Sequence, residues 1–222
     1  MSTLKHIQEK LQQLLYGNDP EHARRDNLKP GQDADYMLNS PQVVGYKSTA
    51  EQQYLFQNLI TGLNVSTSTI LDVGCGRGDL YGFIRELYKD HVFGYRAFDH
   101  NPIMASLAKE KYDLDIQVAA FENIELPTAD WVIASGFFTQ RRCDSEDDDL
   151  RKLFVDVDKM YSAAQQAVAF NLLSPINNKI HEGFFYVHPG LVMDMLIEKY
   201  RYVSIHHNYS NDVYTVTIFK IQ

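Results

Sequence analysis

Apolar positions along the chain follow two alternating patterns. Short apolar runs rich in β-branched and aromatic residues recur, and several of them end at a glycine or an acidic residue. Between these runs, apolar residues lie three and four positions apart, which is the spacing of a helix with one buried face. Strands that alternate with such helices are typical of an α/β protein with a parallel sheet. The predicted strands lie within residues 69–73, 92–99, 115–122, 126–138 and 165–173.

The predicted helices begin at recognisable start signals. Ser48 is a candidate N-cap, Glu51 follows three residues later, and apolar residues then recur at helical spacing. A second helix is predicted from Asp79, and a third from Pro102, which suits the first turn of a helix. Two more helices are predicted after the acidic run 144–149 and around residues 191–196.

The two ends of the chain differ from this regular alternation. Residues 202–207 and 213–219 are rich in β-branched and aromatic residues and flank a short turn, so they predict a closing antiparallel pair. Residues 3–16 predict a short amphipathic helix, and residues 17–40 form a polar stretch that we expect to be a long loop. We therefore expect an N-terminal segment over residues 1–42 and one α/β domain over residues 43–222.

The turn after the first predicted strand carries the clearest chemistry. Asp72 precedes Gly74, Gly76 and Gly78 in the pattern Asp-x-Gly-x-Gly-x-Gly. Glycine allows positive φ and close approach of a ligand, and the free N–H groups of the following helix favour anionic groups. The dinucleotide fingerprint has its third glycine one residue later, where this chain has Asp79. The turn therefore predicts a site for a small polar cofactor other than a dinucleotide.

A second acidic residue supports a nucleoside-containing ligand. Asp99 stands at the end of the second predicted strand, 21 residues after Gly78. A carboxylate in that place can accept hydrogen bonds from both hydroxyl groups of a ribose. The glycine turn and Asp99 together predict a ligand that contains a ribose, such as that of an adenosine group.

These motifs, with the fourth-strand exit Ser135-Gly136-Phe137-Phe138, resemble those of class I S-adenosylmethionine (SAM) dependent methyltransferases. The resemblance covers about residues 43–222. It implies a Rossmann-like three-layer sandwich, with a mostly parallel seven-stranded sheet whose last strand is antiparallel, and it implies SAM as the cofactor. By this resemblance, the residues expected to contact SAM are Tyr46, Asp72, Gly74, Cys75, Gly76, Gly78, Asp99, His100, Asn101, Phe121, Glu122, Ser135, Gly136 and Phe137.

The sequence departs from the commonest family pattern at the third strand. An acidic residue usually stands near Ala120 and binds the adenine amino group, which alanine cannot do. Either the Phe121 backbone and the Glu122 side chain replace that contact, or the adenine pocket is weaker than usual.

The exit of the fourth strand excludes two classes of nucleic-acid enzyme. It lacks the Asp/Asn-Pro-Pro-Tyr motif of enzymes that methylate exocyclic amino groups of bases. It also lacks the Pro-Cys motif of cytosine C5 enzymes, because Cys143 lies several residues further on and has no preceding proline. We expect Cys143 to be an ordinary loop residue.

The loop over residues 174–189 is the candidate acceptor site. It is rich in aromatic residues and histidines, and loops outside the carboxyl ends of parallel strands hold ligands in open α/β sheets. Methyl transfer needs a general base only if the acceptor must lose a proton. The candidates for this base are His181, His188, His206 and His207, each with packing or surface exposure as the alternative role. Neighbouring strand residues point to opposite faces, so at most one of His206 and His207 can face the site, and we retain His207.

Charge and composition disfavour several kinds of binding partner and cellular location. The chain has 21 Lys and Arg against 29 Asp and Glu, a net charge of −8, which disfavours binding to a phosphate backbone. Cys75 and Cys143 show no pairing pattern, so we expect a reducing, cytoplasmic setting. The N-terminus has no secretory pattern and the chain has no long apolar run, so neither secretion nor membrane spanning is expected. The run 144–149 lacks the glycine of a calcium loop, and we expect no metal site there.

We therefore predict a SAM-dependent methyltransferase that acts on an unidentified acceptor, most simply a small molecule. Two alternatives remain open. One is a protein or RNA methyltransferase, and the other is a non-catalytic SAM-binding or interaction protein of the same fold. An NAD-dependent dehydrogenase is disfavoured, because the third dinucleotide glycine is absent and a closing antiparallel pair is predicted. The sequence specifies neither the acceptor nor the oligomeric state.

Overall fold

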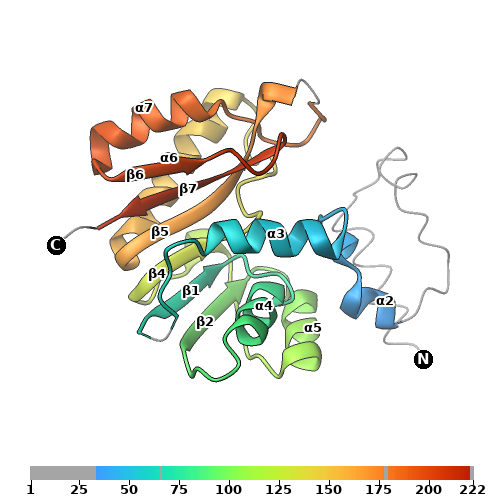
Figure 1. The fold of residues 1–222 in the computed structure, drawn as a ribbon. Helices are drawn as coiled ribbons and strands as arrows, with labels where there is room; N and C mark the ends of the chain where they lie inside the picture. Colours follow the sequence, from blue (N-terminus) through green and yellow to red (C-terminus); the bar gives the residue numbers. More distant parts are fainter. Residues whose placement is uncertain (1–33, 66, 178–179, 221–222) are drawn as a thin grey trace.

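The structure, a computed structural model, describes residues 34–65, 67–177 and 180–220. These residues form a seven-stranded sheet in the order β3-β2-β1-β4-β5-β7-β6 (Figure 1). The strands are β1 (Thr69–Val73), β2 (Gly94–Asp99), β3 (Gln117–Val118), β4 (Ala129–Ala134), β5 (Ala164–Leu173), β6 (Val203–His206) and β7 (Val213–Phe219). Strands β1 to β5 pair in parallel, whereas β7 runs antiparallel to both β5 and β6. The predicted fold, including the antiparallel last strand, is confirmed.

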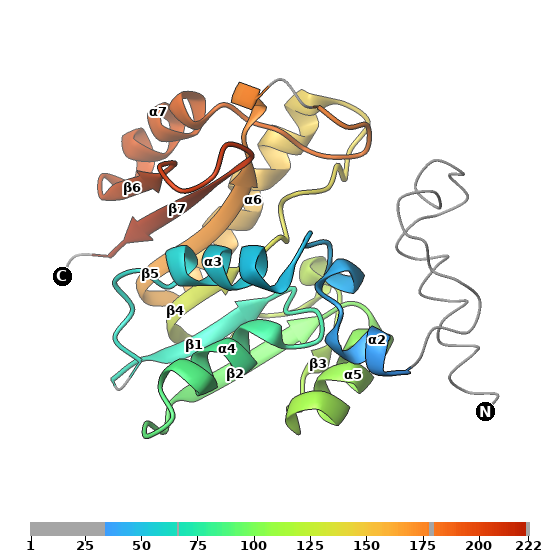
Figure 2. The same cartoon turned by 45° about the vertical axis from the view of Figure 1, so that its right-hand side comes forward.

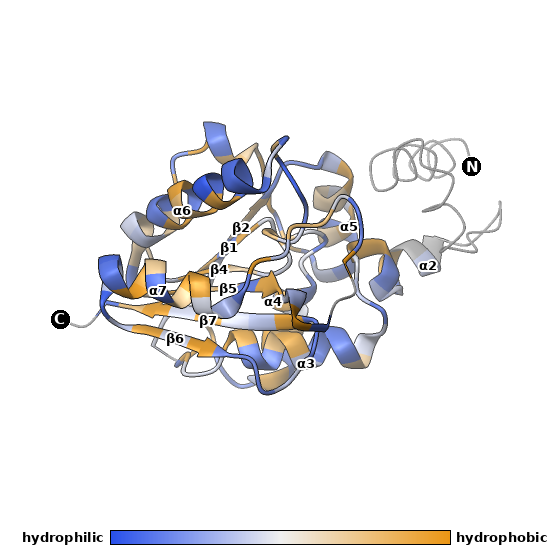
Figure 3. Ribbon diagram, turned by 90° about the horizontal axis from the view of Figure 1, so that it is seen from above, coloured by the Kyte–Doolittle hydropathy of each residue, from blue (hydrophilic) through white to orange (hydrophobic). Residues whose placement is uncertain are grey.

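Helices cover both faces of this sheet. They are α2 (Ala34–Asn39), α3 (Thr49–Leu59), α4 (Asp79–Leu87), α5 (Pro102–Tyr112), α6 (Glu146–Ala163) and α7 (Pro189–Tyr200). Helices α6 and α7 lie over one face, and α3 and α4 lie over the other (Figures 2 and 3). The result is the predicted arrangement of helix, sheet and helix layers.

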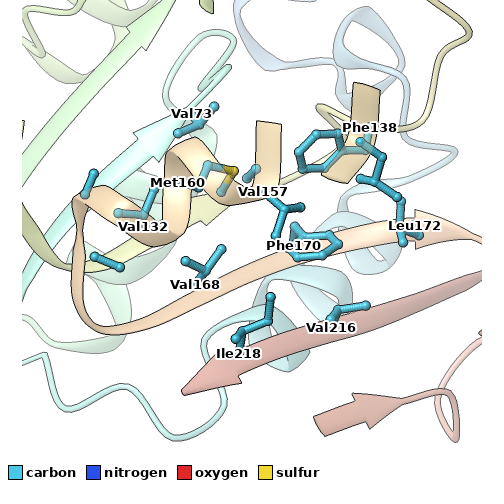
Figure 4. Close-up of a cluster of buried hydrophobic side chains, with 14 of the residues drawn as sticks. Val73, Val132, Phe138, Val157, Met160, Val168, Phe170, Leu172, Val216 and Ile218 are labelled. Carbon is cyan, nitrogen blue, oxygen red and sulfur yellow. The ribbon is translucent and has the colours of Figure 1, made fainter. Parts of the chain in front are cut away.

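The core consists mainly of two clusters, one on each face of the sheet. The larger cluster packs α6 and α7 against the strands and includes Val132, Val157 and Phe170, none of which is exposed (Figure 4). The smaller one packs α3 and α4 against the other face, around Leu59 and Ile84. Because β1 and β4 are buried on both faces, they are almost continuously apolar, which made them legible in the sequence.

The helix starts follow the predicted signals. Ser48 Oγ accepts the backbone N–H of Glu51 (3.1 Å), so Ser48 is the N-cap of α3. The Glu51 carboxylate accepts the N–H of Lys47 (2.6 Å), one residue before the cap. Pro102 begins α5, and Ser145 caps α6, with the acidic residues in its first turn. Carboxylates at that end complement the helix dipole.

Three segment predictions differ from the structure. The stretch expected to be a loop up to residue 40 contains α2. The third strand is only two residues long, because it lies at the sheet edge, and the 3-10 helix η2 (Phe121–Asn123) soon follows it. The fourth strand is limited to Ala129–Ala134. The helix predicted over residues 3–16 lies outside the described residues.

Candidate functional site

Backbone N–H groups of the glycine turn form hydrogen bonds with residues at the end of β2. The N–H groups of Gly74 and Cys75 both donate to the carbonyl of Phe98, at 3.0 and 3.1 Å. One residue later, the N–H of Gly76 donates to Asp99 Oδ2 (2.8 Å). The structure therefore brings together the two features that the sequence singled out, and it places Asp99 directly against the glycine turn.

Asp99 is held in one orientation by the backbone. Its side chain is buried, and Oδ1 accepts the N–H of Asn101 (2.9 Å) while Oδ2 accepts that of Gly76. A carboxylate offers about four lone-pair positions, so each oxygen can accept one more hydrogen bond. Asp99 is thus a preorganised acceptor of further donors.

The three glycines of the turn have different surroundings. All have positive φ, and a Cβ built on Gly76 would meet only Val44, at 3.5 Å. A Cβ on Gly74 would lie 2.6 Å from the ring of Phe137, and one on Gly78 would lie 2.9 Å from Leu114. Gly76 thus faces the more open side of the turn, Gly74 admits an aromatic ring, and Gly78 permits close packing against the segment after α5.

A small cavity of about 50 Å³ opens beside the glycine turn. Six residues predicted to contact the cofactor line it, namely Tyr46, Asp72, Gly74, Cys75, Gly76 and Ser135. They come from the segment before α3, the end of β1 and the exit of β4. These six residues therefore converge on one place from three separate parts of the chain, whereas Asp99 and the other seven predicted contacts are not part of the lining of this cavity.

Asp72 is the most unusual group in this cavity. Its side chain is 1% exposed, the Tyr95 hydroxyl donates to Oδ2, and Oδ1 has no hydrogen-bond partner among the described residues. Burial, together with the nearby Asp99, raises the pKa of Asp72 to about 7, although Tyr95 opposes the shift. A buried carboxylate oxygen without a donor favours a cationic or hydrogen-bond-donating ligand group.

Asp79 organises the floor of the same cavity, a role that the sequence analysis missed. Its carboxylate accepts hydrogen bonds from Gln52 (3.1 Å), Arg77 (2.8 Å), Lys111 (2.8 Å) and the Tyr112 hydroxyl (3.0 Å). Burial opposes ionisation, but the charges of Arg77 and Lys111 hold the pKa of Asp79 below its usual value. The sequence did show an acidic residue, Asp79, where the dinucleotide fingerprint has its third glycine. It could not show the role of Asp79, because Gln52, Lys111 and Tyr112 are distant from it in sequence.

The predicted adenine end of the site is largely engaged by protein contacts. Asn101 Oδ1 accepts the N–H of Ile103 (2.9 Å) and so caps α5, while His100 is exposed, with Nδ1 3.5 Å from Asp99 Oδ1. Phe121 is buried, with its ring centroid 6.2 Å from that of Phe98 and 5.2 Å from that of Phe137. These contacts give Asn101 and Phe121 structural roles in addition to those predicted.

The two groups proposed to replace the acid missing at Ala120 already have partners. Lys159 Nζ donates to the carbonyl of Phe121, and Lys152 Nζ lies 2.9 Å from the exposed carboxylate of Glu122. Each of these oxygens can still accept a further hydrogen bond, so the contacts do not decide between a replaced and a weaker adenine contact. Gly136, with φ of 73°, lies beside the Tyr46 hydroxyl, which would be 3.7 Å from its Cβ.

A larger cavity of about 550 Å³ lies at the predicted acceptor loop. Residues 139–141 and 183–185 form its frame, because Arg141 N–H donates to Gly183 O (2.9 Å) and Phe185 N–H donates to Thr139 O (2.9 Å). The described residues that line it are Arg141, Cys143, Glu146, Pro175, Ile180, His181, Glu182, Gly183, Phe184 and Tyr186.

Asp149 anchors the β4–α6 connection beside this cavity. It is 2% exposed and accepts hydrogen bonds from Arg141 Nε (3.1 Å) and from the backbone N–H groups of Arg142 (2.8 Å) and Cys143 (3.0 Å). The acidic run thus provides a helix start and a loop anchor. Among the described residues, no group of three His, Cys, Asp or Glu side chains could hold a metal ion.

The three candidate base histidines do not meet at one place. His181 lines the larger cavity and is exposed. His188 caps α7, its Nδ1 accepting the N–H of Gly190 (3.1 Å). His207 packs against Tyr214, with ring centroids 5.6 Å apart, and its buried Nε2 has no partner among the described residues. Of the three, only His181 lines one of the two cavities described above.

Comparison with known proteins begins from sequence, where the signal is limited. No family model matches the chain. A stretch of 99 residues is 31% identical to protein 235L of Invertebrate iridescent virus 6, which is described as a candidate methyltransferase. The match covers 43% of this chain and 36% of the viral protein, so this chain spans about a third of that relative's length.

Solved structures match over most of the chain. Magnesium protoporphyrin IX methyltransferase of Synechocystis PCC 6803, crystallised with SAM, aligns with a TM-score of 0.59 and 13% identity, covering 95% of this chain and 97% of that one. Human N-acetylserotonin methyltransferase, also with SAM, aligns with a TM-score of 0.55 and 17% identity, covering 75% of this chain and 52% of the human chain. The predicted resemblance to the methyltransferases is confirmed in the fold. In the part of the chain that the structure describes, no helix is long and apolar enough to cross a membrane.

Proposed function

We propose that this chain, which has the fold of class I SAM-dependent methyltransferases, binds SAM at the glycine turn and transfers its methyl group to a small-molecule acceptor. The observation that carries the proposal is the pairing of Asp99 with the turn, through the N–H of Gly76. A plain structural turn does not explain the buried Oδ1 of Asp72 beside it, which has no hydrogen-bond partner among the described residues.

The residues at the turn suit the two polar ends of SAM. Asp99 would accept both ribose hydroxyls, since each of its oxygens has received only one backbone donor. Asp72, whose Oδ1 has no partner among the described residues, would receive the ammonium group of the methionine part. Gly76 allows the ligand to approach the backbone closely.

Bound SAM supplies an electrophilic methyl group on a positively charged sulfur. The protein's part is alignment, because an in-line displacement depends chiefly on the position of the acceptor atom. Tyr46 and Ser135 line the cofactor cavity, where they would limit the directions from which an acceptor can approach. For an acceptor that must lose a proton, His181 is the base candidate that lines the larger cavity.

The larger cavity supports a small molecule as the acceptor. A volume of about 550 Å³ is within the usual range for small-molecule sites, and Phe184 and Tyr186 provide aromatic walls. The two methyltransferases described above are named for small-molecule substrates, N-acetylserotonin and magnesium protoporphyrin IX. The net charge of −8 argues against RNA, and the free thiols of Cys75 and Cys143 are consistent with a cytoplasmic setting.

One observation favours a non-catalytic relative as the second candidate. Ala120 has no side-chain hydrogen bond to offer the adenine amino group. A chain that binds SAM weakly and has no acceptor would fit this arrangement. Methyl transfer to a member of a small-molecule panel would exclude this candidate.

Substitution of Asp99 by alanine tests the proposed cofactor site. The affinity for S-adenosylhomocysteine, the demethylated product, should fall by about 1.5–3 kcal/mol, because two charge-assisted hydrogen bonds are lost. Isothermal titration measures the effect, and Asp115→Ala, at an exposed carboxylate after α5, is the control. Unchanged affinity in Asp99→Ala would remove this residue from the cofactor site.

A further inference from the structure

A chain of polar side chains crosses the sheet from the cofactor cavity. The Tyr46 hydroxyl lies 2.8 Å from Ser135 Oγ, which donates to Asn171 Oδ1 (3.4 Å). Asn171 Nδ2 donates to Thr215 Oγ1 (3.2 Å), and the Thr215 hydroxyl lies 2.7 Å from that of Tyr209. The five side chains come from the segment before α3, the exit of β4, β5, β7 and the β6–β7 connection.

The middle of this polar chain lies in an apolar region. Asn171 is 3% exposed, and Ala167 and Ala169, which precede it on the same face of β5, are not exposed. Its cross-strand partner is Thr215, which is 1% exposed. Replacing both partners of a buried hydrogen bond by apolar groups of similar shape is often neutral or stabilising. Stability alone therefore does not explain an asparagine at this position.

One end of the polar chain lies at the cofactor cavity, and the other end contacts α3. Tyr46 lines the cofactor cavity, and burial raises the pKa of its hydroxyl further above its already high value, so it remains a neutral hydrogen-bonding group. At the other end, the ring of Tyr209 packs edge-on against that of Tyr54 in α3, with centroids 5.9 Å apart. A second link joins the same segments, because Lys47 Nζ donates to Asp212 Oδ2 (3.2 Å).

We propose that Asn171 is a positioning residue of the cofactor site: through Ser135 it holds Tyr46, and with it the segment before α3, over the cavity at the glycine turn. This inference rests on the proposed function, since the ligand that Tyr46 covers is the proposed cofactor. Asn171 acts from the centre of the sheet and does not itself line the cavity. Its role is to fix the hydroxyl of Ser135, on which the hydroxyl of Tyr46 depends.

Titration of S-adenosylhomocysteine into Asn171→Leu, Tyr46→Phe and the double variant tests the inference. Each single substitution should weaken binding by about tenfold, roughly the effect of losing one buried hydrogen bond. The double variant should bind no more weakly than either single variant, because both act on one chain of contacts. The melting temperature of each variant is measured alongside, so that binding is compared only between folded proteins.

Thr217→Val is the matched control. Thr217 is a buried threonine on the same strand and the same face as Thr215, two residues further along. Its substitution by valine should leave the affinity for S-adenosylhomocysteine unchanged. Wild-type affinity in Asn171→Leu would overturn the positioning role. Additive losses in the double variant would overturn it as well.

Hydrogen exchange in the ligand-free protein separates this inference from the proposed function. The N–H groups of Gly45 and Tyr46 donate to Gln42 O and Pro41 O (both 3.1 Å), so they report on the segment before α3. Their exchange should be faster in Asn171→Leu than in the wild type. Faster exchange without any binding by the wild type would overturn only the cofactor assignment. Unchanged exchange together with wild-type affinity would overturn only the positioning role.

Discussion

The two cavities at the carboxyl edge of the sheet are built in different ways. The cavity at the glycine turn is small, and two of its charged groups, Arg77 and Asp79, are buried and hydrogen-bonded to each other. The cavity at residues 174–189 is about ten times larger by volume, and most of its polar lining, including His181 and Glu182, is exposed. Preorganised groups suit a fixed ligand, whereas an exposed and adaptable lining suits a group that varies between relatives.

This difference predicts that one cavity binds the cofactor and the other binds the acceptor, which substitutions can test. Changes at the glycine turn should alter cofactor affinity strongly. Changes in the larger cavity should alter only the KM for the acceptor and the rate of its methylation.

The largest effect is expected for Gly76→Val. Gly76 has φ of 55°, and a side chain there would both strain the backbone and enter the more open side of the turn. Binding of S-adenosylhomocysteine should fall below detection while far-UV circular dichroism remains close to that of the wild type. Gly62→Val is the control, since Gly62 also has a positive φ, of 88°, but lies between α3 and β1. A side chain there strains the backbone in the same way without entering the cofactor cavity. Retained binding in Gly76→Val would contradict close approach of the ligand to the backbone.

A smaller effect is expected from pH, through Asp72. With a pKa of about 7, its carboxyl is mostly protonated at pH 6 and mostly ionised at pH 8, so the affinity for a ligand with an ammonium group should rise about tenfold across this range. The pKa is raised on folding, so the stability of the ligand-free protein should fall as pH rises from about 4 to about 7, the interval in which the unfolded chain has lost this proton.

The isosteric substitution Asp72→Asn should remove both dependences. Titrations of S-adenosylhomocysteine at pH 6, 7 and 8 measure the first, and denaturant unfolding at the same pH values measures the upper part of the second. An equal pH dependence in Asp72→Asn would assign it to another group.

The smallest effect on the cofactor is expected in the larger cavity. Ile180 is 65% exposed and lines this cavity, whereas Ile176 is 53% exposed and does not appear in its lining. Ile180→Asp should leave the affinity for S-adenosylhomocysteine within about twofold, because it lies outside the cofactor cavity. With any acceptor that the wild type methylates, Ile180→Asp should raise KM, and Ile176→Asp should not. Loss of cofactor affinity in Ile180→Asp would contradict the separation of the two cavities.

The sequence carried more information about the first cavity than about the second. Asp72, the glycines and Asp99 lie at strand ends with fixed spacing, because the turn geometry requires particular residue types at particular positions. The fold was legible for a similar reason, since strands such as β1 and β4 are buried on both faces and read as continuous apolar runs.

Contacts between distant residues could not be read in this way. Asp79 meets Lys111 and Tyr112 across the gap between α4 and α5, and Asn171 meets Ser135 and Thr215 across the sheet. No local pattern marks such partners. In the acceptor loop, His181 and His188 could be listed as candidates, but only the fold shows that one lines a cavity and the other caps a helix.

The most direct test of the account is a parallel titration of the wild-type protein with SAM, S-adenosylhomocysteine and NAD. The glycine spacing and the placement of Asp99 predict micromolar binding of the first two ligands and no binding of NAD. Binding of NAD, or binding of none of the three, would contradict the assignment of the glycine turn as a SAM site.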